Sequence, residues 1–235
     1  MSSAQETVTT LFDATRSFLQ QQAELYGEDF FLPKKVFEKS TLIPIQEPDA
    51  FLALKATVNN CQKCPLHKGR KNAVFGSGKR DARLMIVGEA PGAEEDIQGL
   101  PFVGAAGQLL DKILQAVNFR REDVFITNII KCRPPQNRDP QPEEIKSCIP
   151  YLWKQIQLIQ PQIILAMGRF AGQVLLGKTT SISQMRGQIH SMKGISVLVT
   201  YHPAALLRNA SWKRPTWEDV KLLRQKYDEL STKNK

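Results

Sequence analysis

Four short runs of apolar residues constrain the fold of this chain more than any other feature. They occupy residues 84–87, 124–127, 163–166 and 197–200. Continuous apolar runs of this length are typical of strands that are buried on both faces, as in a parallel sheet. Helical patterns separate or follow them, over residues 106–117, 142–159, 170–176 and 215–230. Strands that alternate with helices predict an α/β fold, with three α/β/α layers around a central, mainly four-stranded parallel sheet.

Two of the expected helices carry local start signals. Pro142 is followed by Glu143 and Glu144, and proline and acidic residues are both favoured in the first turn of a helix. Thr216 and Asp219 have the spacing of a capping box, which predicts that the last helix starts near Pro215.

The first fifty residues differ in pattern from the rest of the chain. An amphipathic helical pattern between Leu11 and Tyr26 is followed by a proline-containing segment that ends near Pro48. We therefore expect an N-terminal arm over residues 1–50 and one domain over residues 51–235. No secretory signal and no membrane-spanning stretch is visible, so we expect an intracellular protein of the bacterial cytoplasm or nucleoid.

The charge balance indicates the kind of partner. The formal net charge is +9 and the isoelectric point is near 9.4. Such a balance favours a polyanion, with nucleic acid as the first candidate, and the alternative is a basic surface that is merely well solvated.

The chain has four cysteines, and their spacing is typical of a metal site. Cys61 and Cys64 form a C-x2-C pair, and Cys132 and Cys148 lie on either side of a proline-rich segment. Two thiolates at the first spacing can grip one centre, and the second pair would complete a four-thiolate site for zinc or an iron–sulfur cluster. The alternative is that Cys148 is an ordinary core residue, because it shares an apolar helical stripe with its neighbours. Disulfides are less expected in a long chain without a secretory signal.

Polar and aromatic residues follow the expected strands at the edge where parallel sheets bind ligands. Glu89 and Glu95 lie in a glycine-rich loop that continues to Phe102, whereas Asn128 and His202 follow two later strands. Phe102 can stack on a flat base, and an asparagine amide offers both a donor and an acceptor to one edge of it. A histidine can donate to an oxygen where negative charge develops. The set indicates a pocket for a planar polar heterocycle.

These motifs resemble those of the family 4 uracil-DNA glycosylases, the iron–sulfur class. The resemblance covers about residues 55–225 and is carried by the segments GEAPGAEED, GLPFVGAAGQLL, TNIIKCRPPQNRDP and YHPAALLRN, together with the cysteine pattern. It implies a monofunctional DNA repair enzyme that flips uracil out of single- or double-stranded DNA and hydrolyses its N-glycosidic bond. No lysine is evident as a Schiff-base nucleophile, so strand cleavage is not expected.

The resemblance also implies roles for individual residues. Phe102 would stack on the flipped uracil, Asn128 would bind its N3–H and O4 edge, and His202 would contact O2. Glu89 would lie near the water and the sugar beside Ala90, a position usually small in this family, and Glu95 would shape the pocket. For Glu95 the alternative is a charged helix start, and for His202 it is a core histidine at a strand end. A [4Fe-4S] cluster is implied for the four cysteines: Cys61, Cys64, Cys132 and Cys148.

The DNA-facing residues follow from the same resemblance. Leu206 and Leu207 are two candidates for an apolar wedge in the minor groove, with Arg208 on a phosphate; the alternative is a plain amphipathic turn. Basic residues of the two cysteine-bearing loops would form a phosphate-facing rim. These residues are Lys63, Lys68, Arg70, Lys71, Lys131, Arg133 and Arg138.

Other functions remain open at this point. His190 lies in a QIH segment like the one through which a related subfamily cross-links to DNA, but this chain lacks the accompanying basic insertion, and Ala90 stands where that subfamily has glutamine. A non-catalytic DNA-binding module and a zinc protein are the further alternatives. We expect a monomer, and any protein partner would be bound through residues 1–50.

Overall fold

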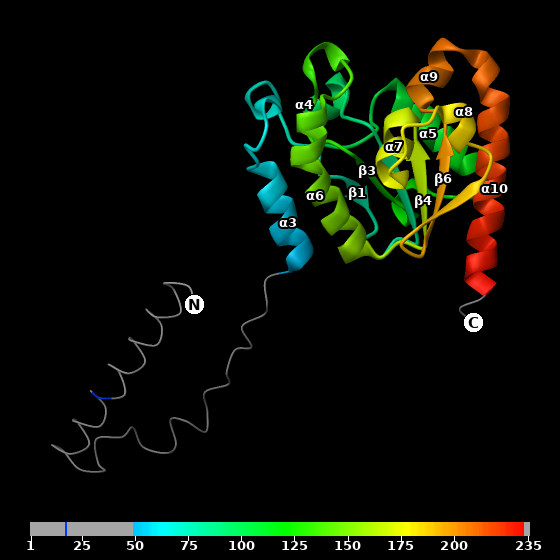
Figure 1. The fold of residues 1–235 in the computed structure, drawn as a ribbon, viewed down its shortest axis with the longest axis horizontal. Helices are drawn as coiled ribbons and strands as arrows, with labels where there is room; N and C mark the ends of the chain where they lie inside the picture. The colour runs from blue at the N-terminus through cyan, green and yellow to red at the C-terminus, as the bar shows by residue number, and fades with distance from the viewer. Residues whose placement is uncertain (1–16, 18–48, 233–235) are drawn as a thin grey trace. The chain divides into compact units, whose positions relative to one another are not determined.

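The computed structural model describes Ser17 and residues 49–232, and the latter lie within one compact unit (Figure 1). The predicted arm therefore falls outside the described residues, apart from Ser17, Asp49 and Ala50. Asp49 caps helix α3 (Ala50–Asn59), because its carboxylate accepts a hydrogen bond from the backbone N–H of Phe51. Among the helices described, none combines the length and the apolar character needed to cross a bilayer.

The centre of the unit is a six-stranded sheet in the order β1-β3-β2-β4-β6-β5. The strands are β1 (Ser77–Gly78), β2 (Leu84–Gly88), β3 (Phe125–Asn128), β4 (Ile163–Met167), β5 (Ile189–Met192) and β6 (Ile195–Thr200). The four predicted strands are the central, mutually parallel ones, so the predicted fold is confirmed. The two edge strands pair antiparallel and were not predicted, because they are short and contain glycine or polar residues.

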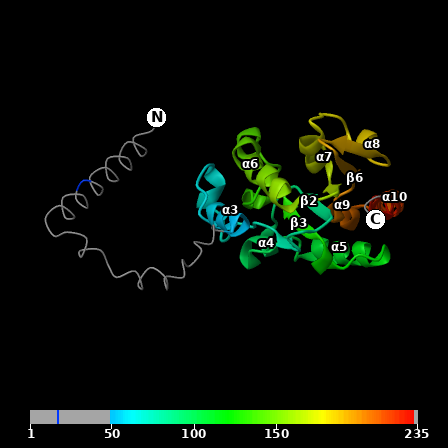
Figure 2. The same ribbon diagram turned by 90° about the horizontal axis from the view of Figure 1, so that it is seen from below.

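Helices cover both faces of the sheet (Figure 2). They are α4 (Ala93–Gln98), α5 (Ala105–Ala116), α6 (Pro142–Ile159), α7 (Arg169–Leu176), α8 (Ile182–Met185), α9 (Pro203–Arg208) and α10 (Lys213–Thr232). Successive strand residues alternate between two apolar cores, since side chains in a strand point to opposite faces. Met85 and Val87 pack with α3, α6 and α7, whereas Leu84 and Ile86 pack with α5 and α10. Burial on both faces explains why the strands read as continuous apolar runs.

One of the two predicted helix starts is correct. α6 begins at Pro142, and the Glu144 carboxylate accepts a hydrogen bond of 2.8 Å from the backbone N–H of Gln141. The predicted capping box of the last helix is wrong, because α10 begins at Lys213. Thr216 lies within this helix and donates to the carbonyl of Trp212 at 2.8 Å.

Candidate active site

A cavity of about 330 Å³ opens at the carboxyl ends of β2, β3 and β6. This is the edge at which parallel sheets bind their ligands, and the volume suits a small planar molecule. Six of the predicted pocket residues line the cavity together: Glu89, Ala90, Glu95, Phe102, Asn128 and His202. Arg138 and Arg208 also line it, whereas Arg133, Leu206 and Leu207 do not.

Asn128 ends strand β3 with its side chain directed into this region. The residue is 1% exposed, and among the described residues its Oδ1 is the one buried side-chain nitrogen or oxygen without a hydrogen-bond partner. Gly88 on the neighbouring strand makes room for it, since a Cβ there would lie 2.3 Å from Oδ1 and 2.7 Å from the Phe102 ring. A buried oxygen without a partner is costly, so its presence indicates a site for a ligand that donates to it.

Phe102 has a backbone conformation that few residues of its kind adopt. Its φ is 52°, in the left-handed region, and the side chain is 5% exposed. Gly107 in α5 approaches the Phe102 carbonyl so closely that a Cβ would lie 1.9 Å from its oxygen. The ring stacks with the ring of His202 at a centroid distance of 5.3 Å. Strain of this kind is kept where the surrounding structure needs one side-chain position, here an aromatic wall of the cavity.

His202 is held as a neutral ring with one donor left for the cavity. It caps α9, where its Nδ1 accepts a hydrogen bond of 3.2 Å from the backbone N–H of Ala204. Burial, together with the positive charge of Arg208, lowers the pKa of His202 to about 4, and Glu95 opposes this shift. At neutral pH the ring therefore carries its proton on Nε2, from which it can donate to an anionic oxygen.

Glu89 follows strand β2 and places a carboxyl group with a strongly shifted pKa in the cavity. Burial raises the pKa of Glu89 to about 7, the negative charge of Asp139 adds to the rise, and Arg169 opposes it. A general base works best when its pKa lies near the working pH, so Glu89 can take up a proton at neutral pH. Asp139 and Arg169 form an ion pair at 3.5 Å, and neither residue was predicted from the sequence to belong to the site. The only signal for Asp139 was its place in the QNRDP segment.

Glu95 stabilises the loops around the cavity. Its Oε1 accepts from the backbone N–H groups of Val103 at 2.9 Å and Gly104 at 3.0 Å, and its Oε2 accepts from Gly92 at 3.1 Å. Gly92 caps α4, so the carboxylate serves the start of that helix and also fixes the loop that carries Phe102. The two interpretations of this residue, a helix start and a pocket-shaping acid, are therefore compatible.

The two leucine candidates differ sharply in exposure. Leu206 is 2% exposed and packs into the core, whereas Leu207 is 54% exposed and Arg208 beside it is also exposed. Only Leu207 is available for contact with another molecule. Leu206 is therefore excluded as a wedge, because its side chain is already buried, at the floor of a hollow that residues of α5 and α10 line with it.

The predicted basic rim needs one correction. Lys131 is 1% exposed, so it cannot face a phosphate from the surface. Arg138 is partly occupied, since it forms a bidentate pair with the buried Glu144 at 2.9 and 2.6 Å and keeps the pKa of that carboxyl below its usual range. Arg133 donates from Nε to Asn137 at 2.8 Å. Lys63, Lys68 and Lys71 are exposed and Arg70 is partly buried.

The four cysteines line one small apolar cavity between α3, the end of β3 and α6: Cys61, Cys64, Cys132 and Cys148. All four are free thiols. Arg70 donates from Nη1 to Cys132 Sγ at 3.0 Å, and the backbone N–H of Lys131 donates to Cys148 Sγ at 3.3 Å. Burial raises the pKa of Cys148 to about 11. Cys148 thus lies on the buried face of α6, as its apolar stripe predicted, and also faces the other three cysteines.

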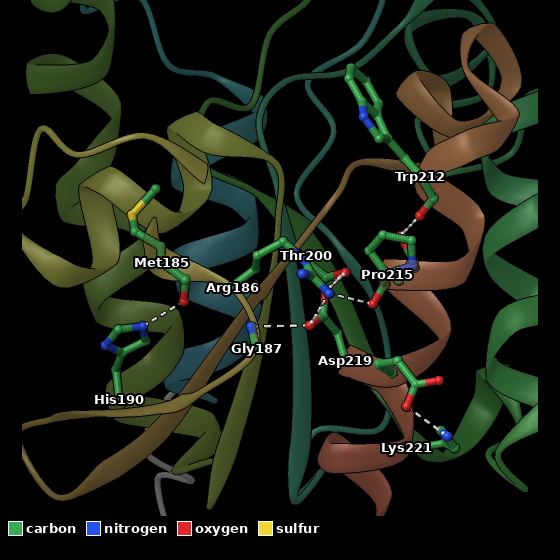
Figure 3. Close-up of polar contacts among 11 residues, drawn as sticks. Met185, Arg186, Gly187, His190, Thr200, Trp212, Pro215, Asp219 and Lys221 are labelled. Carbon is green, nitrogen blue, oxygen red and sulfur yellow. Dashed lines mark hydrogen bonds and ion pairs between the residues drawn. The ribbon is translucent and has the colours of Figure 1, made fainter. Parts of the chain in front are cut away.

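His190 lies apart from the cavity lining. It is on the edge strand β5, where its Nε2 lies 2.7 Å from the carbonyl oxygen of Met185 (Figure 3). It is absent from the residues around Glu89 and Asn128. The geometry gives it no access to a base bound there.

A second polar cluster fastens β6 to α10 (Figure 3). Asp219 is fully buried and accepts hydrogen bonds from Arg186, from the backbone N–H of Gly187 at 3.1 Å and from the Thr200 hydroxyl at 2.7 Å. Arg186 also donates to the carbonyl of Pro215 at 2.5 Å. The cluster fixes the end of the strand that leads to His202. The sequence offered only the misleading helix-cap signal for Asp219.

Comparison with known proteins defines the class to which this fold and site belong. A family model described as the uracil DNA glycosylase superfamily matches residues 75–221. The chain belongs to this superfamily. Within it, the similar curated proteins include type-4 enzymes, so the resemblance noted from the motifs is confirmed.

Three of these relatives show how far the similarity extends. The type-4 uracil-DNA glycosylase of Archaeoglobus fulgidus is 44% identical over 172 residues, covering 70% of this chain and 86% of the relative. That of Saccharolobus solfataricus is 47% identical over 177 residues, covering 72% and 82%. That of Thermotoga maritima is 47% identical over 167 residues, covering 69% and 87%.

Proposed function

We propose that this protein is a type-4 uracil-DNA glycosylase, which releases uracil from DNA and leaves an abasic site. One observation carries the proposal, namely the unpartnered Asn128 Oδ1 in a cavity walled by Phe102 and His202. The sequence similarity to type-4 enzymes supports it. Because the substrate is DNA, we propose that the protein acts inside the cell.

Base recognition follows from the hydrogen-bond pattern of an asparagine amide. Asn128 Oδ1 would accept from the N3–H of uracil, and Nδ2 would donate to O4. Cytosine has an acceptor at N3 and a donor at the neighbouring position, so it would leave the amide mismatched on both sides. Phe102 would stack on the base, and extrusion of the base from a duplex costs a few kcal/mol. Ala90 and Glu95 would shape the wall that excludes larger bases.

Bond cleavage requires one donor and one base in this cavity. When the bond between C1′ and N1 breaks, its electron pair stays on uracil, and negative charge develops on O2. His202 Nε2–H would donate to that oxygen, an interaction worth about 3 kcal/mol in comparable sites. Water would then attack the oxocarbenium-like sugar, and the Glu89 carboxylate would accept its proton. The resulting product is an intact strand with an abasic sugar.

We also propose that the cysteines hold a [4Fe-4S] cluster. Zinc would draw four sulfurs to about 2.3 Å from one point, whereas a cluster spreads its thiolates over separate irons. Four cysteines around one apolar cavity fit the second arrangement. When bound, the cluster would supply a cross-link between the loop after α3, the loop after β3 and helix α6.

The DNA-contacting surface would lie beside the cavity mouth. The exposed Leu207 would fill the space left by the extruded base, and Arg208 would contact a phosphate. Arg133 and Arg138 would contact the backbone from the loop after β3. Each phosphate neutralised would steepen the salt dependence of binding by about 0.9 in log–log slope.

A glycosylase assay tests the proposal directly. Single- and double-stranded oligonucleotides with one uracil are incubated with the protein, treated with alkali and resolved on a gel. We expect cleavage only after alkali, and only where uracil is present; matched oligonucleotides with thymine or cytosine are the control. Intact uracil strands after long incubation with iron-loaded protein would refute the activity. Iron analysis and visible absorbance separate a cluster from zinc.

A further inference from the structure

Lys131 occupies an unusual place for a lysine. Among residues 49–232 it is the one cationic side chain in the buried set, and it is 1% exposed. Burial of a charged side chain is costly unless its hydrogen bonds are satisfied, so the partners of Lys131 Nζ indicate what the residue does. Lys131 lines the cysteine cavity, and its Nζ bonds the carbonyl oxygen of Asn128, which lines the base pocket.

The side chain is fastened to the end of strand β3. Its Nζ donates to Thr127 Oγ1 at 2.7 Å, to the carbonyl oxygen of Asn128 at 2.6 Å and to Gln155 Oε1 at 2.7 Å. An ammonium group has three N–H donors, so these acceptors use all of them. Two of the three belong to Asn128 and the residue before it. The ammonium group therefore fixes the backbone that carries the base-reading amide.

The backbone of Lys131 is fastened to the cysteine site. Its N–H donates to Cys148 Sγ at 3.3 Å, and its carbonyl accepts from the backbone N–H of Val74 at 2.7 Å. The acceptors of Nζ are all uncharged oxygens. One residue thus contacts both a cysteine sulfur and the recognition strand, through separate atoms.

We propose that Lys131 is a positioning residue that holds Asn128 in place for the base, and that it connects the cysteine site to the pocket. The proposal rests on the proposed function, because it takes Asn128 as the group that reads uracil. Asn128 Oδ1 has no protein partner to keep it oriented, so its orientation depends on the backbone beneath it. Removal of Nζ leaves the Asn128 carbonyl without this donor and frees the end of the strand to move.

A double-mutant cycle tests this role against a merely structural one. Lys131→Met keeps an unbranched apolar stem and removes the ammonium; it is combined with Asn128→Ala, and kcat/KM is measured on a single-stranded uracil oligonucleotide. We expect Lys131→Met alone to lower kcat/KM about 10- to 100-fold, with unchanged iron content and visible absorbance. In the Asn128→Ala background it should cost less than about threefold further. Equal losses in both backgrounds would overturn the proposal.

Arg70→Met is the matched control. Arg70 is also a cation at the cysteine site, where it donates to Cys132 Sγ at 3.0 Å and to the Asn59 carbonyl at 2.7 Å, but it has no bond to the recognition strand. We expect Arg70→Met to change kcat/KM by the same factor in the wild-type and in the Asn128→Ala background, whatever the size of that factor. Coupling as strong as that of Lys131 would mean that any damage at the cysteine site disturbs the pocket, and would overturn the specific role.

A milder variant covers the case in which Lys131→Met does not fold. Thr127→Val keeps the side-chain shape and removes one acceptor of Nζ next to Asn128. We expect a smaller loss that again disappears in the Asn128→Ala background, and a loss of equal size in both backgrounds would overturn the proposal. Wild-type protein that leaves uracil in place refutes the proposed function and, with it, this role. Active wild-type protein with independent losses refutes only the role of Lys131.

Discussion

Asn128 and Asp219 are both buried polar residues near the carboxyl edge of the sheet, yet the fold treats them in opposite ways. Asp219 is surrounded by donors from Arg186, Gly187 and Thr200, whereas Asn128 Oδ1 has none. A buried polar group whose hydrogen bonds are all formed stabilises the fold. A buried polar group without a partner costs stability until a ligand supplies one. The contrast separates what holds the enzyme together from what the enzyme binds.

Loss of the framework group should have the largest effect on stability. Asp219→Ala leaves Thr200 without its acceptor and Arg186 with the Pro215 carbonyl alone, and breaking such a buried ion pair costs about 3–5 kcal/mol of unfolding free energy. Urea denaturation measures the loss, and turnover per folded molecule should stay near the wild-type value. Glu218→Ala, at the adjacent residue whose exposed carboxylate pairs with Lys221 at 2.7 Å, should change stability by less than about 0.5 kcal/mol. Equal losses of unfolding free energy for Asp219→Ala and Glu218→Ala would contradict the structural role of Asp219.

Asn128 should show the reverse behaviour, with a small effect on stability and a large effect on activity. Asn128→Ala removes no protein hydrogen bond of Oδ1, so we expect little change in the urea midpoint. Turnover of uracil should fall about a hundredfold, since one lost transition-state or recognition contact typically costs about 3 kcal/mol. Gel assays of initial rates provide the measurement. A strongly destabilised but fully active variant would place Asn128 with the framework instead.

The pH dependence of turnover tests Glu89, because a carboxyl group with only a structural role would not control the rate. Its pKa is raised to about 7, so below that pH the proton is already bound and the base is lost. We expect kcat/KM, whose pH profile reports the free enzyme, to fall about tenfold from one pH unit to the next on the acid side. Asp139→Asn removes a charge that raises this pKa, and should move the acid limb of the profile to lower pH. A profile flat between pH 5 and 8 would argue against Glu89 as the base.

The smallest effect on activity is expected for Leu207, the exposed member of the pair Leu206 and Leu207. Leu207→Ala removes an exposed side chain, and we expect a few-fold loss on duplex uracil with little change on single strands, which have no stacked gap to fill. Leu206→Ala instead removes a core side chain and should cost about 2–5 kcal/mol of stability. Parallel rate and denaturation measurements on the two variants distinguish them. Equal duplex activity of the wild type and Leu207→Ala would remove this residue as the wedge.

Much of the fold could be predicted because its signals are local. The apolar runs at residues 84–87 and 163–166 marked strands buried on both faces, and Pro142 marked a helix start, since each reflects the environment of consecutive residues. The edge strands β1 and β5 escaped prediction because they have one neighbouring strand and need no apolar run. The start of α10 was misplaced because Asp219 bonds across the fold rather than to its own helix.

The sequence by itself determined the α/β architecture, the cavity residues Glu89, Phe102, Asn128 and His202, and the four cysteines, since motif spacing and apolar periodicity express them directly. Only the tertiary structure decided which side chains are buried and which polar groups have hydrogen-bond partners. It placed Lys131 inside the core, Leu206 beneath the surface and Leu207 upon it. Burial and hydrogen bonding depend on contacts between segments far apart in the chain, and no local pattern of residues contains them.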